Sequence, residues 1–238
     1  MSNAVGYNNL QATTKYFSFG RVFRNVGTDG AKYHLYDFST EGMDWGGQDF
    51  IQLLGTDNAV TYFKAVYLDD PDDPSEDGWY NPADPWGTPA ENIEIDAGTG
   101  FLCAMPSCKP SAPVTFKFNG EVEKGRTVVA MAKYPFVANP LPCDLKLYDI
   151  KAVGMDWGGQ DFLQLLGTDN AVTYFKAVYL DDPDDPSEDG WYDPADPWGT
   201  PAENVDIPAG QALLGAMPSC KPSAPVTFIF PDPFELEK

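Results

Sequence analysis

The chain has 238 residues, with 36 acidic and 15 basic side chains and a formal charge of −21. This excess of negative charge repels phosphate backbones and anionic lipid surfaces, so the composition argues against binding to nucleic acid or to a membrane surface. A hydrophobic content of 43%, with 14% aromatic residues, predicts a folded protein despite 22 Pro and 22 Gly. No apolar run approaches the ~18 residues of a membrane-spanning helix, so we expect no membrane insertion.

An internal repeat organises the sequence. Residues 42–92 recur as residues 154–204, an offset of 112 residues from Gly42 to Gly154, with only Ile51/Leu163 and Asn81/Asp193 exchanged. A unit of this length is close to the usual size of a domain and can bury its own core. We therefore predict two tandem domains, residues 1–119 (copy one) and residues 120–238 (copy two).

The predicted elements are short strands. Asp49–Leu54 has the composition of a strand, Gly55–Asn58 that of a turn, and Val60–Leu68 that of a returning strand. Phe101–Met105 and Val114–Phe118 follow as two further strands, and copy two repeats the pattern. Helical periodicity is nearly absent. The sequence predicts an all-β fold in which each copy forms a β-sandwich or a small barrel.

The junction between the copies carries a turn signal. Asn119-Gly120 lies between alternating segments, which predicts a hairpin that joins the last strand of copy one to the first strand of copy two, with strand sharing. Copy two ends instead at Pro231, so its closing strand would lack such a partner. Val5–Leu10 could fill that place within the chain or from a neighbouring molecule, which would give head-to-tail self-assembly. The alternative is an ordinary edge, blunted by Pro231 and the charged tail.

An acidic loop follows the second predicted strand of each copy. Six carboxylates fall within residues 69–77, and a hard cation such as Ca²⁺ would relieve their repulsion. The predicted metal ligands are Asp69, Asp70, Asp72 and Asp73, with Asp181, Asp182, Asp184 and Asp185 as their copies. The prolines within the loop break the EF-hand pattern. The alternative is a solvated acidic turn that keeps a long loop soluble.

Aromatic residues form the second candidate site. Several of them lie among Asp, Asn, Pro and Gly, where aromatic faces beside polar groups suit the stacking of carbohydrate rings. The predicted ligand-binding residues are Trp79, Tyr80 and Trp86, with Trp191, Tyr192 and Trp198 as their copies. The alternative is that these side chains cover the ends of the β-core and hold irregular loops in place.

Cysteines and catalytic motifs give little guidance. Cys103 and Cys108 could form a disulfide, Cys143 could bridge the copies, or the thiols could be free. Zinc is disfavoured because the chain has no Cys-x-x-Cys motif and a single histidine, His34, which Lys146 replaces in copy two. No nucleophile motif is present, and we expect no enzymatic activity, with glycoside hydrolysis by paired carboxylates a distant alternative.

Several segments resemble a family. They are Val5–Asn8, Asp49–Leu54, Asp77–Tyr80, Pro89–Asn92, Ala97–Phe101 and Asn119–Val122. With them the chain resembles a group of uncharacterised, secreted, β-rich tandem-repeat proteins from Gram-negative bacteria. The resemblance implies export with removal of a leader, and a secreted, periplasmic or cell-surface location. It implies no activity, and copy two lacks the Gly-Tyr-Asn start.

Taken together, these features predict a non-enzymatic secreted or cell-surface protein with a structural or interaction role, whose partner is another copy of itself. The alternative is a carbohydrate-binding module that recognises a surface glycan, assisted by Ca²⁺.

Overall fold

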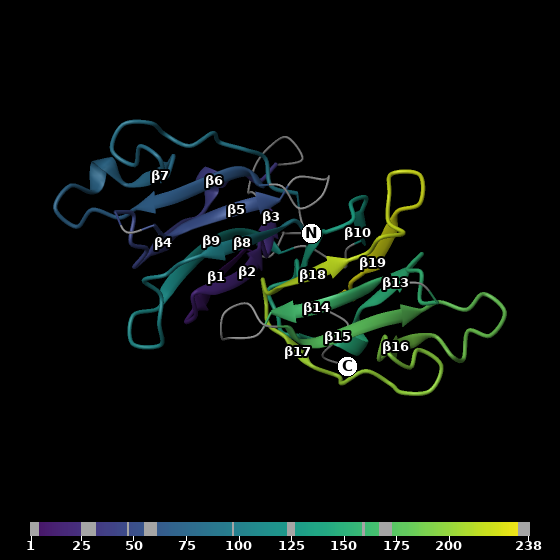
Figure 1. The fold of residues 1–238 in the computed structure, drawn as a ribbon. Helices are drawn as coiled ribbons and strands as arrows, with labels where there is room; N and C mark the ends of the chain where they lie inside the picture. Colours follow the sequence, from purple (N-terminus) through teal and green to yellow (C-terminus); the bar gives the residue numbers. More distant parts are fainter. Residues whose placement is uncertain are drawn as a thin grey trace.

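The computed structural model describes residues 5–24, 32–46, 48–54, 61–96, 98–122, 127–158, 160–166 and 173–232. Within these residues the regular structure consists of β-strands and short 3₁₀ helices, which confirms the predicted all-β class (Figure 1). The described residues include no helix long and apolar enough to cross a membrane. The predicted turn at Gly55–Asn58 lies outside the described residues.

The two halves share the order of their main strands, but among the described residues β3 and η2 occur in the first half alone, and β12 and β17 in the second half alone. The first half contains β1 (Val5–Ala12), β2 (Tyr16–Gly20), β3 (Phe23–Arg24), η1 (Leu35–Asp37), β4 (Ser39–Glu41), β5 (Phe50–Leu54), β6 (Thr61–Leu68), η2 (Pro74–Glu76), β7 (Gly78–Tyr80), β8 (Gly100–Ala104) and β9 (Val114–Val122). The second half contains β10 (Thr127–Ala130), β11 (Phe136–Ala138), β12 (Leu145–Lys146), η3 (Leu147–Asp149), β13 (Lys151–Val153), β14 (Phe162–Leu166), β15 (Thr173–Leu180), β16 (Gly190–Tyr192), β17 (Asp206–Ile207), β18 (Ala212–Ala216) and β19 (Val226–Ile229).

Each half builds two larger antiparallel sheets. In copy one, β2-β8-β5-β6-β7 forms one sheet, and β9 forms the centre of the other, with β1 on one side and β3 and β4 on the other. In copy two, β11-β18-β14-β15-β16 and β10-β19-β13 are the corresponding sheets. The predicted hairpin of β5 and β6 is confirmed, with Ile51 opposite Ala65. We call β1-β9-β4 and β10-β19-β13 the closing sheets.

The predicted hairpin at Asn119-Gly120 is wrong. Both residues lie inside β9, where Asn119 pairs with Tyr7 and Gly120 pairs with Gly6. The eight-residue ladder between β1 and β9 supplies hydrogen bonds that a turn at this point would forfeit. The predicted boundary between residues 119 and 120 therefore falls within a strand of the copy-one sheet.

The closing strand of copy two does not lack a partner. β19 pairs with β10 on one side and with β13 on the other. The segment Val5–Leu10, which we considered for that place, pairs with β9 of its own copy. The hypothesis of head-to-tail strand addition assumed that β19 lacks a partner strand, and β19 has one on each side.

The strand pairing also corrects the sequence register of the opening strands. Ala12 pairs with Val114 in copy one, and Ala130 pairs with Val226 in copy two. Val226 is the copy of Val114 at the offset of 112, but Ala130 follows Ala12 by 118 residues. The opening strands therefore correspond at an offset of 118 residues, six more than the rest of the repeat. An alignment at a constant offset of 112 residues misses this correspondence.

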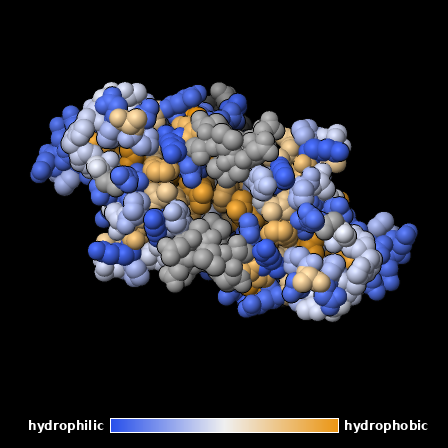
Figure 2. Space-filling model, viewed as in Figure 1, coloured by the Kyte–Doolittle hydropathy of each residue, from blue (hydrophilic) through white to orange (hydrophobic). Residues whose placement is uncertain are grey.

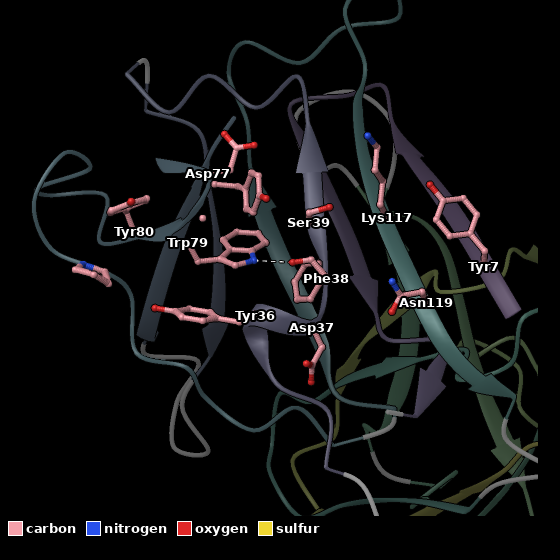
Figure 3. A pocket seen from close by; sticks show the side chains of 13 residues that line it. Tyr7, Tyr36, Asp37, Phe38, Ser39, Asp77, Trp79, Tyr80, Lys117 and Asn119 are labelled. Carbon is pink, nitrogen blue, oxygen red and sulfur yellow. Dashed lines mark hydrogen bonds between the residues drawn. The ribbon is translucent and has the colours of Figure 1, made fainter. Parts of the chain in front are cut away.

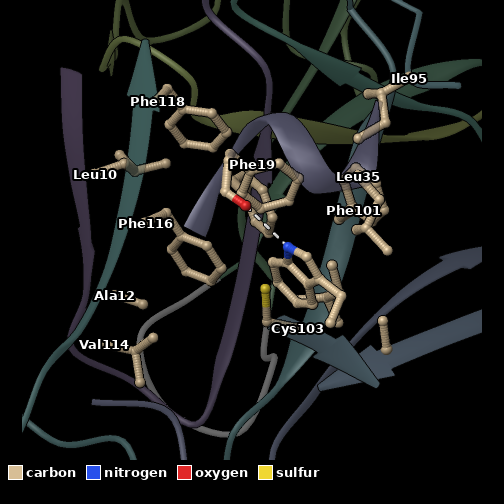
Figure 4. Packing of buried hydrophobic residues seen from close by; sticks show 14 of the residues in the cluster. Leu10, Ala12, Phe19, Leu35, Ile95, Phe101, Cys103, Val114, Phe116 and Phe118 are labelled. Carbon is tan, nitrogen blue, oxygen red and sulfur yellow. Dashed lines mark hydrogen bonds between the residues drawn. The ribbon is translucent and has the colours of Figure 1, made fainter. Parts of the chain in front are cut away.

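The core of copy one is aromatic. Phe19 lies 4.2 Å from Phe116 and 5.3 Å from Phe101, measured between ring centroids, and Phe38 stacks on Phe118 at 5.0 Å (Figure 4). The alternation of buried and exposed residues along β9 directs Phe116 and Phe118 inward. Copy two fills three of these places with smaller residues, Val137, Ile150 and Leu213, all of them buried.

All four cysteines are free thiols. Cys103, Cys108 and Cys220 are buried, and the Cys108 thiol donates to the Ala12 carbonyl (3.1 Å). Burial raises the pKa of the half-buried Cys143 thiol, with a smaller contribution from Asp144. The thiols therefore serve as small apolar side chains, and neither predicted disulfide forms.

The two copies meet in a reciprocal contact. The Gly20 N–H donates to the Gly210 carbonyl (2.8 Å), and the Ala138 N–H donates to the Gly98 carbonyl (3.0 Å). The two bonds are equivalent. Ala138 stands in copy two where Gly20 stands in copy one, and Gly210 stands where Gly98 stands. The isolated bridges Phe19↔Gln211 and Thr99↔Val137 repeat the same relation. The junction thus has the pattern of a two-fold, isologous interface.

Close packing holds this junction together. A methyl group added at Gly20 would lie 2.3 Å from the Ala138 Cβ and 2.5 Å from the Thr99 carbonyl oxygen. One added at Gly100 would lie 2.6 Å from the Phe136 Cβ. The backbones therefore approach one another more closely than any side chain at these glycines would allow.

The reciprocal junction places corresponding loops at opposite ends of the molecule. The connections from β6 to β7 and from β15 to β16, which carry the acidic residues, project in opposite directions (Figure 1). On the face seen in Figure 2, hydrophobic residues gather near the middle, and hydrophilic residues cover both ends.

Candidate functional site

Trp86 and Trp198 are the most exposed tryptophans of the described residues, each with 63% of its surface accessible. Each follows the short strand β7 or β16, in a loop held by its own hydrogen bonds. In copy one the Thr88 hydroxyl donates to Asp84 Oδ2 (2.7 Å), and the Asn81 N–H donates to the Thr88 carbonyl (2.9 Å). Copy two repeats these bonds around Asp196. The exposed indoles are therefore presented by ordered loops.

A second tryptophan supports each exposed one. Trp45 meets Trp86 edge-on at 4.1 Å between ring centroids, and Trp157 meets Trp198 in the same way at 4.1 Å. Aromatic rings favour this edge-to-face arrangement because the positive edge of one ring meets the negative face of the other. We call each of these arrangements a tryptophan pair.

A buried carboxylate anchors the loop that carries the supporting tryptophan. Asp49 is 1% exposed and accepts the Asp44 N–H (3.0 Å) and the Ser107 N–H (3.1 Å). The Ser107 hydroxyl donates to the same carboxylate. Asp161 makes the matching bonds in copy two. These charge-assisted bonds join the Trp45 loop to the turn after β8 and fix its position.

A cavity of about 420 Å³ lies beside the tryptophan pair of copy two. Trp157, Tyr134, Phe162 and Pro194 line it together with the polar residues Lys133 and Gln160. Aromatic walls with a few polar groups are typical of sites for small ligands. Copy one has the same residue types at the corresponding places, which are Trp45, Tyr16, Phe50, Pro82, Lys15 and Gln48.

The lysine and the tyrosine of this site were not predicted from the sequence. Both copies carry Ala-x-x-Lys-Tyr, at Ala12–Tyr16 and at Ala130–Tyr134. In each copy the lysine amine lies 5.3 Å from the centroid of the following tyrosine ring. The motif was a usable signal, but it recurs at an offset of 118 and is lost when the repeat is aligned without a gap.

Trp79 and Trp191 have a different environment from the one that we expected. They are 2% and 3% exposed, and their indole N–H groups donate to the carbonyls of Phe38 (2.9 Å) and Ile150 (2.7 Å). Alternation along β7 and β16 directs both side chains into the core. In this structure they support the fold, and almost none of either side chain is exposed.

Tyr80 and Tyr192 are half-buried, and hydrogen bonds fix their rings. Their hydroxyl groups donate to the carbonyls of Glu76 and Glu188, each at 2.9 Å. Of the six predicted ligand-binding residues, the structure therefore presents two fully, Trp86 and Trp198, and two at the edge of the core.

The acidic loop uses its carboxylates to shape its own backbone. Asp70 accepts the Asp72 N–H (2.9 Å), and Asp73 accepts the N–H and the hydroxyl of Ser75. Asp77 accepts the Asp70 N–H (2.8 Å). Copy two repeats this set from Asp182 to Asp189. These are local side-chain turns that replace missing backbone bonds beside the prolines.

The predicted calcium ligands do not converge. Among the described residues, which include Asp69, Asp70, Asp72, Asp73 and their four copies, no group of three or more His, Cys, Asp or Glu side chains could hold a metal ion. The hydrogen bonds from Ser75 hold the pKa of Asp73 below its usual value, which keeps that carboxylate ionised without a cation. The geometry therefore matches the solvated acidic turn.

Comparison with protein-family models, with curated proteins and with solved structures finds no match. The resemblance to secreted tandem-repeat proteins therefore stays a prediction, and the function has to be argued from the surface of this chain.

Proposed function

We propose that this protein is a non-catalytic carbohydrate-binding protein that uses one tryptophan pair in each copy. The observation that carries the proposal is the matched exposure of Trp86 and Trp198, at 63% each, on loops that are already ordered. An exposed indole face stacks on the C–H face of a sugar ring, and an ordered loop loses little entropy when the sugar binds.

The polar residues beside the tryptophan pair fit the same role. Lys133 and Gln160 line the cavity of copy two with Trp157, and they offer donors and an acceptor to sugar hydroxyl groups. The surplus of acidic residues favours a neutral polysaccharide over an anionic one. A polysaccharide partner also agrees with the surface or extracellular location that the family resemblance implies.

The two sites lie at opposite ends of the molecule, which affects how they act together. β7 and β16, which precede the two tryptophan loops, lie at opposite ends of the molecule (Figure 1). Two sites on one face would bind neighbouring segments of one chain and increase avidity. Sites at opposite ends instead connect separate polysaccharide chains, so we propose that the protein acts as a cross-linking interaction module.

Binding to insoluble and soluble polysaccharides tests this proposal. Trp86→Ala and Trp198→Ala should each weaken binding by at least ~10-fold at the altered site, and the double variant should lose the binding that these two sites contribute, because an aromatic anchor contributes more than ~1.4 kcal/mol. Val153→Ala, an exposed apolar control on the closing sheet of copy two, should bind like the unaltered protein. Equal binding by the double variant would contradict the proposal, and release of soluble sugar would reveal catalysis.

A further inference from the structure

Copy one has a second candidate site, away from its tryptophan pair. A groove of about 550 Å³ runs from β7 and η1 to the outer face of the closing sheet β1-β9-β4 (Figure 3). Its volume is in the range of sites for small ligands. None of the four residues of the two tryptophan pairs lines it.

Two exposed tyrosines line this groove. Tyr7 is 63% and Tyr36 is 49% exposed. Tyr36 lies beside the buried indole of Trp79, and Tyr7 stands at the far end on β1 (Figure 3). Large aromatic side chains left accessible in a concave surface indicate contact with a partner, because their burial would stabilise the protein.

Hydrogen bonds orient the aromatic rings before any ligand arrives. The Tyr36 hydroxyl donates to the Ala90 carbonyl (2.6 Å), and its backbone N–H donates to Asn92 Oδ1 (3.0 Å). The Tyr80 hydroxyl donates to the Glu76 carbonyl (2.9 Å). With their hydroxyl groups engaged, both rings offer flat faces and lose little rotational freedom on binding.

Polar groups stand along the same groove. Asn119 and Ser39 offer an amide and a hydroxyl, and Asp77 offers a carboxylate, whose Oδ1 accepts the Asp70 N–H. A carboxylate can accept several hydrogen bonds. Lys117 is paired with Glu41 (2.7 Å), so its positive charge is compensated. The carboxylates of Asp37 and Asp77 repel anions. Flat aromatic faces with uncharged donors and acceptors match a neutral ring rich in hydroxyl groups.

Copy two lacks this combination. Ile229, Pro231 and Lys151 occupy the positions of Lys117, Asn119 and Ser39. Proline has no N–H, and neither Pro231 nor Ile229 has a polar side chain. Tyr148, the copy of Tyr36, nevertheless keeps its exposure (47%) and its hydroxyl bond to the Ala202 carbonyl (2.6 Å). The tyrosine and Asp77 are thus duplicated, but Ser39, Lys117 and Asn119 are not.

We infer that the groove of copy one is a binding site for a neutral oligosaccharide, separate from the tryptophan pairs and present once in the chain. Tyr36 and Tyr7 stack on sugar rings at the two ends, and Asn119, Ser39 and Asp77 bind hydroxyl groups between them.

The test uses the full chain with Trp86→Ala and Trp198→Ala already introduced, so that the tryptophan pairs contribute nothing. Calorimetric titration with cellohexaose, xylohexaose, maltohexaose and chitohexaose measures what remains. We expect one site per chain for at least one of these sugars, weakened at least ~10-fold by Tyr36→Ala. Tyr148→Ala, the matched change in copy two, should leave the affinity unchanged.

Tyr7→Ala is a second probe because Tyr7 is 63% exposed and its loss should leave the fold intact. It should also weaken binding. If the Trp86→Ala, Trp198→Ala double variant binds none of these oligosaccharides, the groove is not a binding site, and the proposed function of the tryptophan pairs still stands. Binding that survives in that background but disappears with Tyr36→Ala would support the groove, even if the tryptophan pairs prove inactive. Equal effects of Tyr36→Ala and Tyr148→Ala, or tighter binding of oligogalacturonate, would overturn the inference.

Discussion

The outer faces of the two closing sheets show what the copies share and where they differ. In copy one this face carries Gln11, Thr115 and Glu41 in one cross-strand row and Asn9, Lys117 and Ser39 in the next. In copy two the matching rows are Val129, Thr227 and Val153, then Thr127, Ile229 and Lys151. The strand pairing is the same, but copy one has a polar surface with an ion pair, whereas three of the six residues in copy two are apolar.

The inner faces of the same strands differ much less in character. Leu10, Phe116 and Thr40 in copy one correspond to Val128, Phe228 and Ala152 in copy two, and all six are buried. Inward positions must fill a shared core, whereas outward positions are free of that requirement. The outer faces are therefore where the two copies can differ in what they bind, whereas the inner faces are held alike by the core.

The largest expected effect comes from breaking the junction that relates the two copies. Gly20→Ala places a methyl group 2.3 Å from the Ala138 Cβ and should destabilise the protein by about 2–3 kcal/mol, a fall in melting temperature of roughly 5–10 °C. Gly190→Ala, whose added methyl group meets only Tyr192 at 3.6 Å, is the control and should change little. Partial recovery by Ala138→Gly would identify the clash, and an unchanged melting temperature would contradict it.

A smaller effect is expected at Asp69, which interacts with Glu41 and Lys117 on the outer face of the copy-one closing sheet. Burial raises the pKa of Asp69, and the neighbouring carboxylates of Asp77 and Glu41 raise it further. The folded state therefore holds this proton more tightly than the unfolded chain, so the stability contributed by protonated Asp69 is lost as pH rises through its folded pKa. Asp69→Asn should stabilise the protein at pH 7 and have no such effect at pH 3, as measured by urea denaturation.

Asp181→Asn is the matched control for this change. Val153 stands in copy two where Glu41 stands in copy one, so one source of repulsion is missing. The control should stabilise the protein less than Asp69→Asn does. An equal gain in the free energy of unfolding from both variants would show that repulsion from Glu41 does not destabilise ionised Asp69.

The smallest effect is expected from exchanging the faces themselves. Val153→Glu with Ile229→Lys gives copy two the ion pair that Glu41 and Lys117 form in copy one. Because Val153 and Ile229 are 44% and 39% exposed, and a surface ion pair contributes about 0.2–1 kcal/mol, stability should change by less than ~1 kcal/mol. Chemical denaturation at low and high salt measures this, and a large loss would show that the apolar face is part of the folded core.

Local patterns predicted much of this fold from the sequence. Alternation and turn residues located β5, β6, β8 and the start of β9, because these strands have one buried face. The same reasoning failed at Asn119-Gly120, since pairing with Tyr7 and Gly6 comes from the other end of the copy and no local signal reports it.

The candidate site was less predictable. Trp79 has polar neighbours in the sequence, yet the three-residue strand that contains it turns its side chain inward to reach the Phe38 carbonyl. A three-residue strand is too short to show an alternating pattern of polar and apolar residues in the sequence. Trp86 lies in the loop after this strand, beyond two prolines, and stays exposed. The groove was not predictable at all, because Tyr7, Tyr36 and Asn119 come together only when β1 pairs with β9.

The reciprocal junction has a consequence for how such a molecule can specialise. In a homodimer of identical chains, every change on one outer face appears on the other, and each site exists in two copies. Here the same contact is made within one chain, by the pairs Gly20–Gly210 and Ala138–Gly98. Because the two halves belong to one chain, their sequences need not be identical, so one outer face can carry a polar groove that the other lacks, without a change in the contact that joins them.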